Sequence, residues 1–404
     1  AGKTHTAVWW VLPLPRAEYY DMVNAIRRAQ GTNFTLPGGF AFVPTLRTTL
    51  EWSREKLAEW VRCKAAHFVC ASIPKLPNGK YAHGTALPQA DLSLPRDVLK
   101  AFQQAAPQVR TLMYYHTFIS TEEGAREKYA ADAIRDAAGN QGDYGQEIYP
   151  LFFPTLENAY GRAMRQNVEL LLGSVGANGV YWDEMEYSRL RYTYGGPWDG
   201  VSADIDPKSL TIARKKSSVV LLTQPFKLSV ARERLLDRGV PLVANGQPHT
   251  WTMTQLHFPR FVETGSITRL ASAQLYSPIG LGDHLTERTE VDVARQIAAH
   301  LDFGCLYYWY SGQINPTHPN LTAYMFPFTP LELREGVAIG RERILANRSG
   351  LFGWGDTCAH EVHVFNREGR GSTAFPPRTV TRDGQTFTEL RIPAGYTAAI
   401  IRRP

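Results

Sequence analysis

Three carboxylates stand within four residues of the stretch GANGVYWDEMEYS, residues 176–188, directly after an apolar run typical of a buried strand. Asp183, Glu184 and Glu186 repel one another when ionised, and burying an unpaired carboxylate costs several kcal/mol. A negative charge also raises the proton affinity of its neighbour, so such a group can hold one carboxyl protonated and another ionised at the same pH. The stretch therefore indicates acid–base chemistry.

Glu263 is a second acidic candidate, about 80 positions later in FVETGS, where its neighbours Val262 and Thr264 carry no charge. Cleavage of a glycosidic bond needs one carboxyl group to protonate the leaving oxygen and another to attack the anomeric carbon or activate water. We expect Asp183 to be the nucleophile or base and Glu263 the general acid/base. Side chains alternate along a strand, so Asp183 and Glu184 cannot both point inward from a regular one. We expect the following loop to turn Glu184, which would support catalysis.

Aromatic and polar side chains stand at or near the ends of several apolar runs, where rings could stack on sugars and polar groups could bind hydroxyls. Core packing is the competing interpretation for the tryptophans. For His116 the alternative is a structural buried histidine, and for Asn245 it is turn chemistry. Glu186 could instead pair with Arg189 or Arg191. The expected substrate-binding residues are Glu186, Tyr187, Trp182, Tyr114, His116, Asn245, Trp309 and Trp10.

Strand-like runs alternate with helical patterns from the N-terminus to about residue 312. Eight strand–helix units over roughly 310 residues match a (β/α)8 TIM barrel, whose strands are buried on both faces. An open doubly wound sheet has the same local pattern, but it usually carries a Gly-rich phosphate loop, and no GxGxxG or P-loop motif is present. The expected strands cover 4–13, 38–44, 66–73, 109–118, 179–184, 240–246, 272–282 and 305–312.

Two insertions rich in turn residues interrupt the pattern, near 192–218 and 247–266, and in a barrel both would lie on the rim where active sites are built. The spacing over 332–350 predicts a helix. Short alternating runs then predict a small antiparallel, β-sandwich-like domain. We therefore expect a catalytic barrel over 1–335 and a C-terminal β domain over 336–404.

Composition restricts the possible partners. The net charge of +6 is mild for 404 residues and no Lys/Arg tract occurs, which argues against nucleic acid, although a basic surface could favour an anionic glycan. There is no apolar run of membrane length. The four cysteines show no metal-ligand spacing, and we expect no metal and no cofactor. The chain begins at Ala1 without Met, which suggests processing and a secreted or periplasmic protein, with the cytoplasm left open.

The stretch 176–188 resembles the strand-end motifs of TIM-barrel glycoside hydrolases, in which a buried strand after a Gly-containing turn ends in Asp or Glu. The predicted C-terminal β domain resembles the one that many of these enzymes carry. The resemblance implies hydrolysis of an oligo- or polysaccharide, without singling out one family. The adjacent Asp183 and Glu184 also resemble the carboxylate pair of substrate-assisted hexosaminidases, but the His-Gly-Gly lead-in of that family is absent.

Three other functions fit parts of the pattern. A non-catalytic glycan-binding protein would use the aromatic residues alone. A polysaccharide lyase acting on uronates would use His116 or a tyrosine as its base. A metal-dependent hydrolase could hold a cation between the 183–186 carboxylates and His249 or His257.

Overall fold

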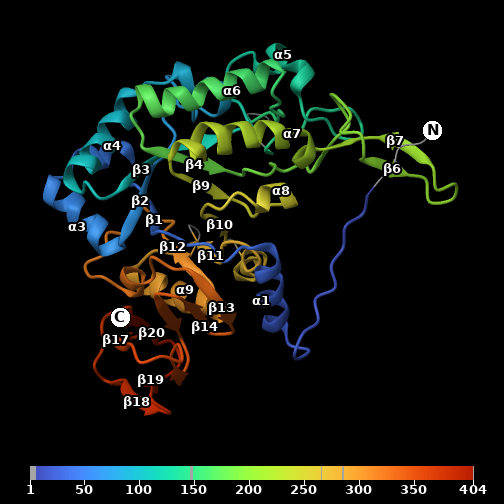
Figure 1. Ribbon diagram of the computed structural model, residues 1–404. Coiled ribbons are helices and arrows are strands. Elements are labelled where there is room, and N and C mark those ends of the chain that lie inside the picture. Colours follow the sequence, from blue (N-terminus) through green and yellow to red (C-terminus); the bar gives the residue numbers. More distant parts are fainter. Residues whose placement is uncertain (1–5, 146–148, 265, 284–285, 404) are drawn as a thin grey trace.

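Eight parallel strands form one sheet that closes into a barrel in the computed structural model, which describes residues 6–145, 149–264, 266–283 and 286–403 (Figure 1). The sheet closes where the backbone N–H of Trp309 donates to the carbonyl of Phe40 at 3.0 Å. In spatial order the strands are β1 (Gly39–Phe42), β2 (Ala66–Ala71), β3 (Arg110–His116), β4 (Gly179–Asp183), β9 (Leu242–Asn245), β10 (Arg260–Glu263), β11 (Ile279–Leu281) and β12 (Leu306–Tyr308).

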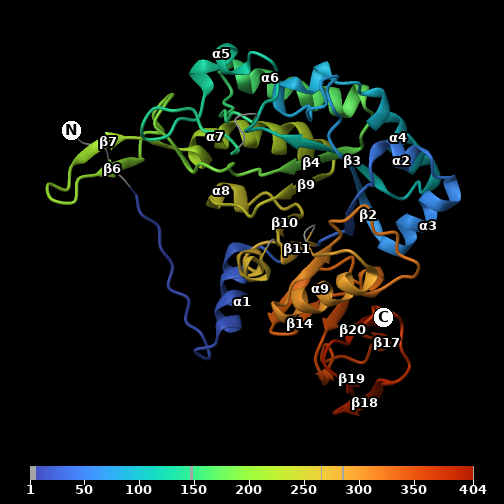
Figure 2. The same ribbon diagram turned by 180° about the vertical axis from the view of Figure 1, so that it is seen from behind.

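Helices connect the strands and cover the outside of the barrel (Figures 1 and 2). Their starts follow local capping chemistry: the Ser53 side chain accepts from the N–H of Lys56, and Thr289 and Asp292 form a reciprocal capping box. The longer helices end near the expected residues, which fixes the strand ends between them. The α-helices of this part are α1 (Tyr19–Gln30), α2 (Leu46–Leu50), α3 (Arg54–Lys64), α4 (Ser93–Ala105), α5 (Ala125–Lys128), α6 (Ala159–Glu169), α7 (Val219–Leu228), α8 (Trp251–Thr254) and α9 (Glu290–Asp302).

One expected strand is absent and an unexpected strand replaces it. Residues 6–13 form no strand, and Trp9 is 78% exposed; residues 4 and 5 lie outside the described part of the chain. A closed barrel has no free edge to which this segment could add. The eighth strand is β10, inside the stretch 247–266 that was expected to be a rim insertion. Because β10 pairs with β9 and β11, Glu263 ends a barrel strand.

The insertion after β4 forms two small antiparallel pairs. One pair, β6 and β7, projects from the barrel on the side away from the C-terminal domain, as both views show (Figures 1 and 2). The other pair lies at the base of this projection. The four strands are β5 (Tyr192–Thr193), β6 (Ala203–Ile205), β7 (Ile212–Lys215) and β8 (Ser217–Ser218).

The C-terminal region is antiparallel and consists of a five-stranded and a three-stranded sheet. Both sheets contribute to one apolar core, as Ile344 and Ile400 of the first sheet and Leu390 of the second illustrate. The helix expected over 332–350 was wrong, because these residues form strands whose apolar side chains alternate between this core and the large core that includes the barrel. The strands are β13 (Pro330–Arg334), β14 (Val337–Gly340), β15 (Arg343–Ala346), β16 (Gly350–Phe352), β17 (Ala359–Phe365), β18 (Arg378–Arg382), β19 (Gln385–Leu390) and β20 (Thr397–Arg403).

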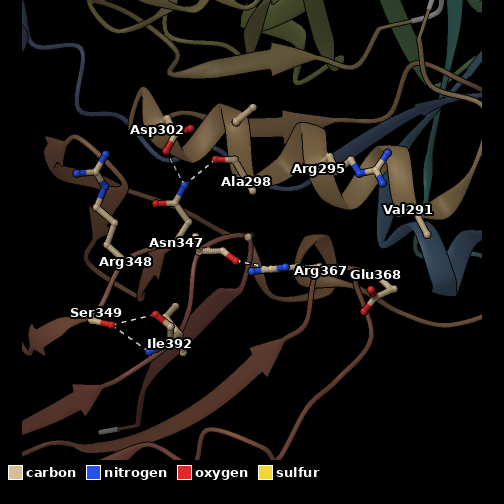
Figure 3. A pocket seen from close by; sticks show the side chains of 13 residues that line it. Val291, Arg295, Ala298, Asp302, Asn347, Arg348, Ser349, Arg367, Glu368 and Ile392 are labelled. Carbon is tan, nitrogen blue, oxygen red and sulfur yellow. Dashed lines mark hydrogen bonds between the residues drawn. The ribbon is translucent and has the colours of Figure 1, made fainter.

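Helix α9 joins the two regions. The Asn347 amide donates to the carbonyl of Ala298 at 2.7 Å and to the Asp302 carboxylate at 2.8 Å (Figure 3). The β domain is therefore held against the outer face of the barrel, away from the strand ends that carry the candidate site. Within the described residues, none of the helices combines the length and the apolar character needed to cross a bilayer.

Candidate active site

Asp183 is the last residue of β4 and lies at the centre of a hydrogen-bond network. Its carboxylate accepts from the hydroxyls of Tyr114 (2.6 Å) and Tyr181 (2.8 Å), and from the Asn245 amide (2.9 Å). The backbone N–H of Glu184 adds a fourth donor at 3.1 Å. The donors come from β3, β4 and β9, so the closed sheet brings together groups that are far apart in the sequence. They surround Asp183 as donors surround a charged carboxylate.

Glu263 faces the same network from the end of β10. The Asn245 amide nitrogen that binds Asp183 also lies 3.3 Å from Glu263 Oε2. Burial, and then the negative charge of Asp183, raise the pKa of Glu263 above its usual value. The two carboxyl groups therefore share one amide, and Asp183 accepts more hydrogen bonds from the described residues than Glu263 does.

The distance between the two acids is bounded by the amide that joins them. The Asp183 and Glu263 oxygens lie 2.9 and 3.3 Å from one nitrogen, so they are at most 6.2 Å apart, which is the two distances laid end to end. Retaining glycosidases hold their carboxyl groups about 5–5.5 Å apart and inverting ones about 6.5–9.5 Å. The upper bound of 6.2 Å lies below the inverting range and includes the retaining range.

A cavity of about 650 Å³ opens above this pair at the carboxyl ends of the strands. This volume is within the usual range for small-molecule sites, roughly 300–1,000 Å³. Its wall combines aromatic rings with acidic groups and a neutral histidine, His83, whose pKa burial lowers to about 3. The side chains that define the wall include Phe42, Tyr81, His83, Tyr114, Tyr181, Asp183, Glu263, Glu287, Arg288 and Tyr310.

Glu184 leaves the strand direction at once, because its backbone is left-handed with φ of 46°. Its carboxylate lies 3.0 Å from His116 Nε2 and accepts from the Tyr144 hydroxyl at 3.0 Å. The N–H of Phe118 donates to His116 Nδ1, so the neutral ring carries its proton on Nε2 and donates to Glu184. Glu184 and His116 thus form a pair beside the Asp183 network.

Glu186 was expected to bind substrate, but its side chain is 3% exposed and lies in the protein interior. Its carboxylate is 2.9 Å from Lys227 Nζ and 2.6 Å from Arg260 Nη1, and both cations are buried. Burial alone would raise the pKa of Glu186, but the two cations outweigh it and hold the pKa below its usual value. Both cations bind its carboxylate, and Glu186 is absent from the described lining of the cavity in which Asp183 and Glu263 lie.

The tryptophans expected as sugar platforms are accounted for by packing. Trp182 and Trp309 are at most 1% exposed, and their indole N–H groups donate to Thr117 and Thr322. Trp10, in the segment before α1, is 50% exposed, and its ring packs edge-to-face on Trp251.

Tyr187 is half-buried. Its hydroxyl accepts from Arg191 at 3.1 Å and its ring lies against His249. It is absent from the described lining of the cavity.

Several residues of the cavity wall were not predicted from the sequence, because the prediction used chiefly the ends of the strands. His83 follows β2 and Glu287 follows β11, both in loops at the carboxyl side of the barrel. Loops in that position build the active sites of barrel enzymes, and this rule is the signal that could have identified them. Tyr181 was not predicted as a site residue, because it lies within β4 rather than at its end. Among the described residues, no group of three or more His, Cys, Asp or Glu could hold a metal ion.

Comparisons with known proteins bear on the fold. No protein-family model matches the sequence, and no curated protein resembles it at a significant level. Among solved structures, the galactosidase domain of the alpha-galactosidase-sucrose kinase AgaSK is similar, with 10% identity and a TM-score of 0.50 over 94% of this chain and 58% of that one. A xylosidase from Aspergillus niger has 9% identity and a TM-score of 0.50, over 95% of this chain and 67% of that one.

A Flavobacterium johnsoniae GH31 dextranase, solved as a variant in complex with isomaltotriose, has 9% identity and a TM-score of 0.51. The match covers 94% of this chain and 54% of the dextranase. This chain therefore spans only about half to two thirds of the length of these three structures. Its fold, a (β/α)8 barrel followed by an antiparallel β domain, is one that glycoside hydrolases have.

Proposed function

We propose that this protein is a glycoside hydrolase that cleaves an oligo- or polysaccharide with retention of configuration. Asp183 attacks the anomeric carbon and Glu263 protonates the leaving oxygen, then takes the proton from the water that releases the sugar. The observation that carries the proposal is the Asn245 amide held between the two carboxylates at the edge of an open cavity.

The surroundings of the two acids support this division of roles. Four donors among the described residues bind the Asp183 carboxylate, and each of these hydrogen bonds is stronger when the acceptor carries a negative charge. Among the described residues Glu263 accepts one hydrogen bond, on Oε2, and its raised pKa favours the protonated form that a general acid needs. A nucleophilic carboxylate must instead be unprotonated. The different surroundings of the two carboxyl groups therefore match their proposed roles.

Glu184 supports the pair without taking part in the reaction. His116 and Tyr144 hold its carboxylate to one side, where its charge lies among the causes that raise the pKa of Glu263. Asn245 positions the two reacting groups. Tyr114 and Tyr181 orient Asp183, and the rings that line the cavity provide the apolar surface on which a sugar can stack.

Turnover of a panel of aryl glycosides tests the proposal, with the product anomer followed by NMR. We expect release of the aryl group from at least one glycoside and a first product with the configuration of the substrate. The variant Glu233→Gln, at an exposed position on the outside of the barrel, is the matched control and should retain full activity.

Three results would contradict the proposal. Glycan binding without turnover of any glycoside would support a binding protein. An unsaturated, ultraviolet-absorbing product would indicate a lyase, and a first product of opposite anomeric configuration would indicate inversion.

A further inference from the structure

Glu287 is a third acidic residue in the wall of the same cavity, in the loop between β11 and α9, and its side chain is 2% exposed. Its Oε1 accepts from the Tyr307 hydroxyl at 2.7 Å and from the backbone N–H of Asp283 at 3.0 Å. Its Oε2 is buried and has no hydrogen-bond partner within the part of the chain that the structure describes. A buried polar oxygen without a donor is costly, so this one needs a ligand or another explanation.

Gly282 makes the space in which this carboxyl group lies. A Cβ at position 282 would lie 2.3 Å from Glu287 Oε1, 2.7 Å from Oε2 and 2.5 Å from the Tyr307 hydroxyl. No residue other than glycine can therefore stand there without displacing the carboxyl group. Both carboxyl oxygens thus lie against the backbone of Gly282, and among the described residues Oε1 has two donors while Oε2 has none.

Carboxyl groups outnumber cations in the described lining of the cavity. Asp183, Glu263 and Glu287 line it, against one guanidinium, that of Arg288, among the described lining residues. Burial raises the pKa of Glu287 to about 7, so the group is largely ionised at pH 8. A second anion brought beside these carboxylates would be repelled, whereas a hydroxyl or an ammonium group could donate to Glu287.

We propose that Glu287 is a specificity-determining residue that accepts a hydrogen bond from a hydroxyl or amino group of the sugar, and that it makes the site select neutral and amino sugars over sugars bearing a carboxylate or sulfate. This inference rests on the proposed glycosidase function. It differs from the expectation, based on the overall basic charge, that the glycan could be anionic.

The test compares Glu287→Gln, which keeps the shape, Glu287→Leu, which removes both oxygens, and the control Glu233→Gln. Turnover at pH 8 is measured with aryl glycosides of a hexose, the matching 2-amino-2-deoxyhexose and the matching hexuronic acid. Binding of the three methyl glycosides is measured by calorimetry in the same variants. Unfolding curves identify any variant that does not fold.

We expect the parent to prefer the hexose and the amino sugar over the uronide by at least about 100-fold. Glu287→Gln should reduce this preference by about tenfold, because it removes charge while keeping a hydrogen-bonding group. Glu287→Leu should raise KM for the hexose about tenfold with little change in kcat, a division that loss of packing alone would not produce.

Equal preference for the uronide in the parent, or unchanged selectivity in Glu287→Gln, would overturn the inference. So would an unchanged KM for the hexose in a folded Glu287→Leu. The proposed function can fail separately from this inference. In that case no glycoside is hydrolysed, but the parent binds the neutral methyl glycoside selectively and Glu287→Leu loses that binding. Glu287 then keeps its role in a protein that binds glycans without cleaving them. If turnover occurs and the Glu287 variants behave as the parent does, only the inference about Glu287 falls.

Discussion

Asp183 and Glu186 are three residues apart, yet they lie in opposite environments. Asp183 stands at the edge of an open cavity and is surrounded by neutral donors. Glu186 is enclosed by the protein and bound by two buried cations, Lys227 and Arg260. The first arrangement leaves a charged oxygen that a substrate can approach, while the second neutralises the charge within the fold.

The difference teaches that the partners of a carboxylate, rather than its neighbours in the sequence, determine its role. Arg260 begins β10 and Glu263 ends it, so one strand supplies a cation to the structural site and an acid to the candidate active site. The two sites are therefore coupled through the position of β10. Substitutions that affect one of the two sites without the other test whether the two carboxylates have different roles.

Replacing Asp183 by Asn should have the largest effect. The nucleophile is lost while the shape is kept, so kcat/KM should fall on the order of 10⁴-fold, equivalent to about 5.5 kcal/mol of transition-state stabilisation. The free energy of unfolding should change by far less. Parallel kinetics and urea unfolding measure both quantities, and activity within tenfold of the parent would remove Asp183 from the mechanism.

Replacing Glu186 by Gln should have the opposite signature. Two buried cations would lose their carboxylate, which should lower the free energy of unfolding by about 3–5 kcal/mol. The kcat per folded molecule should stay close to that of the parent, measured at a temperature where the variant is folded. A stable variant with a large loss of kcat would place Glu186 in the active site after all.

Replacing Glu263 by Gln should lower kcat by about 10²–10⁴-fold, the usual contribution of a general acid–base group. The acid works in its protonated form, and burial raises its pKa, so activity of the parent should fall as the pH rises through that raised value. The variant should lose this alkaline limb, and substrates whose leaving groups need no proton should suffer least. An alkaline limb that persists in the variant would assign the acid to another group.

Replacing Glu287 by Gln should have a smaller effect on activity than replacing Asp183 or Glu263, and an effect on stability that depends on pH. The pKa of Glu287 is about 7 in the folded protein and that of an unfolded glutamate is about 4.3. The folded state therefore binds the proton more tightly, and stability of the parent falls as the pH rises between these values.

The variant lacks this dependence, so relative to the parent it should gain up to about 3 kcal/mol between pH 4 and pH 8. Unfolding curves at the two pH values measure the gain. An identical pH dependence in both proteins would mean that the Glu287 carboxyl is not held in the protonated form.

Much of the barrel could be predicted, because helices with clear caps and apolar runs of six or more residues carry strong local signals. The predicted number of eight barrel strands is correct because one expected strand is absent and one unexpected strand replaces it. The run 4–13 has the composition of a strand, but its described residues 6–13 find no open edge. Strand β10 has only four residues and begins with Arg260, whose buried charge pairs with the distant Glu186.

The site was predicted in part. Asp183 and Glu263 meet because strand ends converge at one rim, which follows from the fold class. The burial of Trp182, Trp309 and Glu186 depends on contacts with residues far away in the sequence, and no local pattern reports it. The same holds for 332–350, where residues with a helix-like spacing form strands because one face packs on the second sheet and the other on the large core that includes the barrel.

The most direct test of the central claim is chemical labelling of the nucleophile. An activated 2-deoxy-2-fluoro glycoside of the preferred sugar traps the covalent intermediate of a retaining glycosidase, and mass spectrometry of the digested protein locates the modified residue. Our account predicts one sugar per chain, bound to Asp183. A turning-over enzyme that carries the label on Glu184 or Glu263, or that takes up no label, would contradict it.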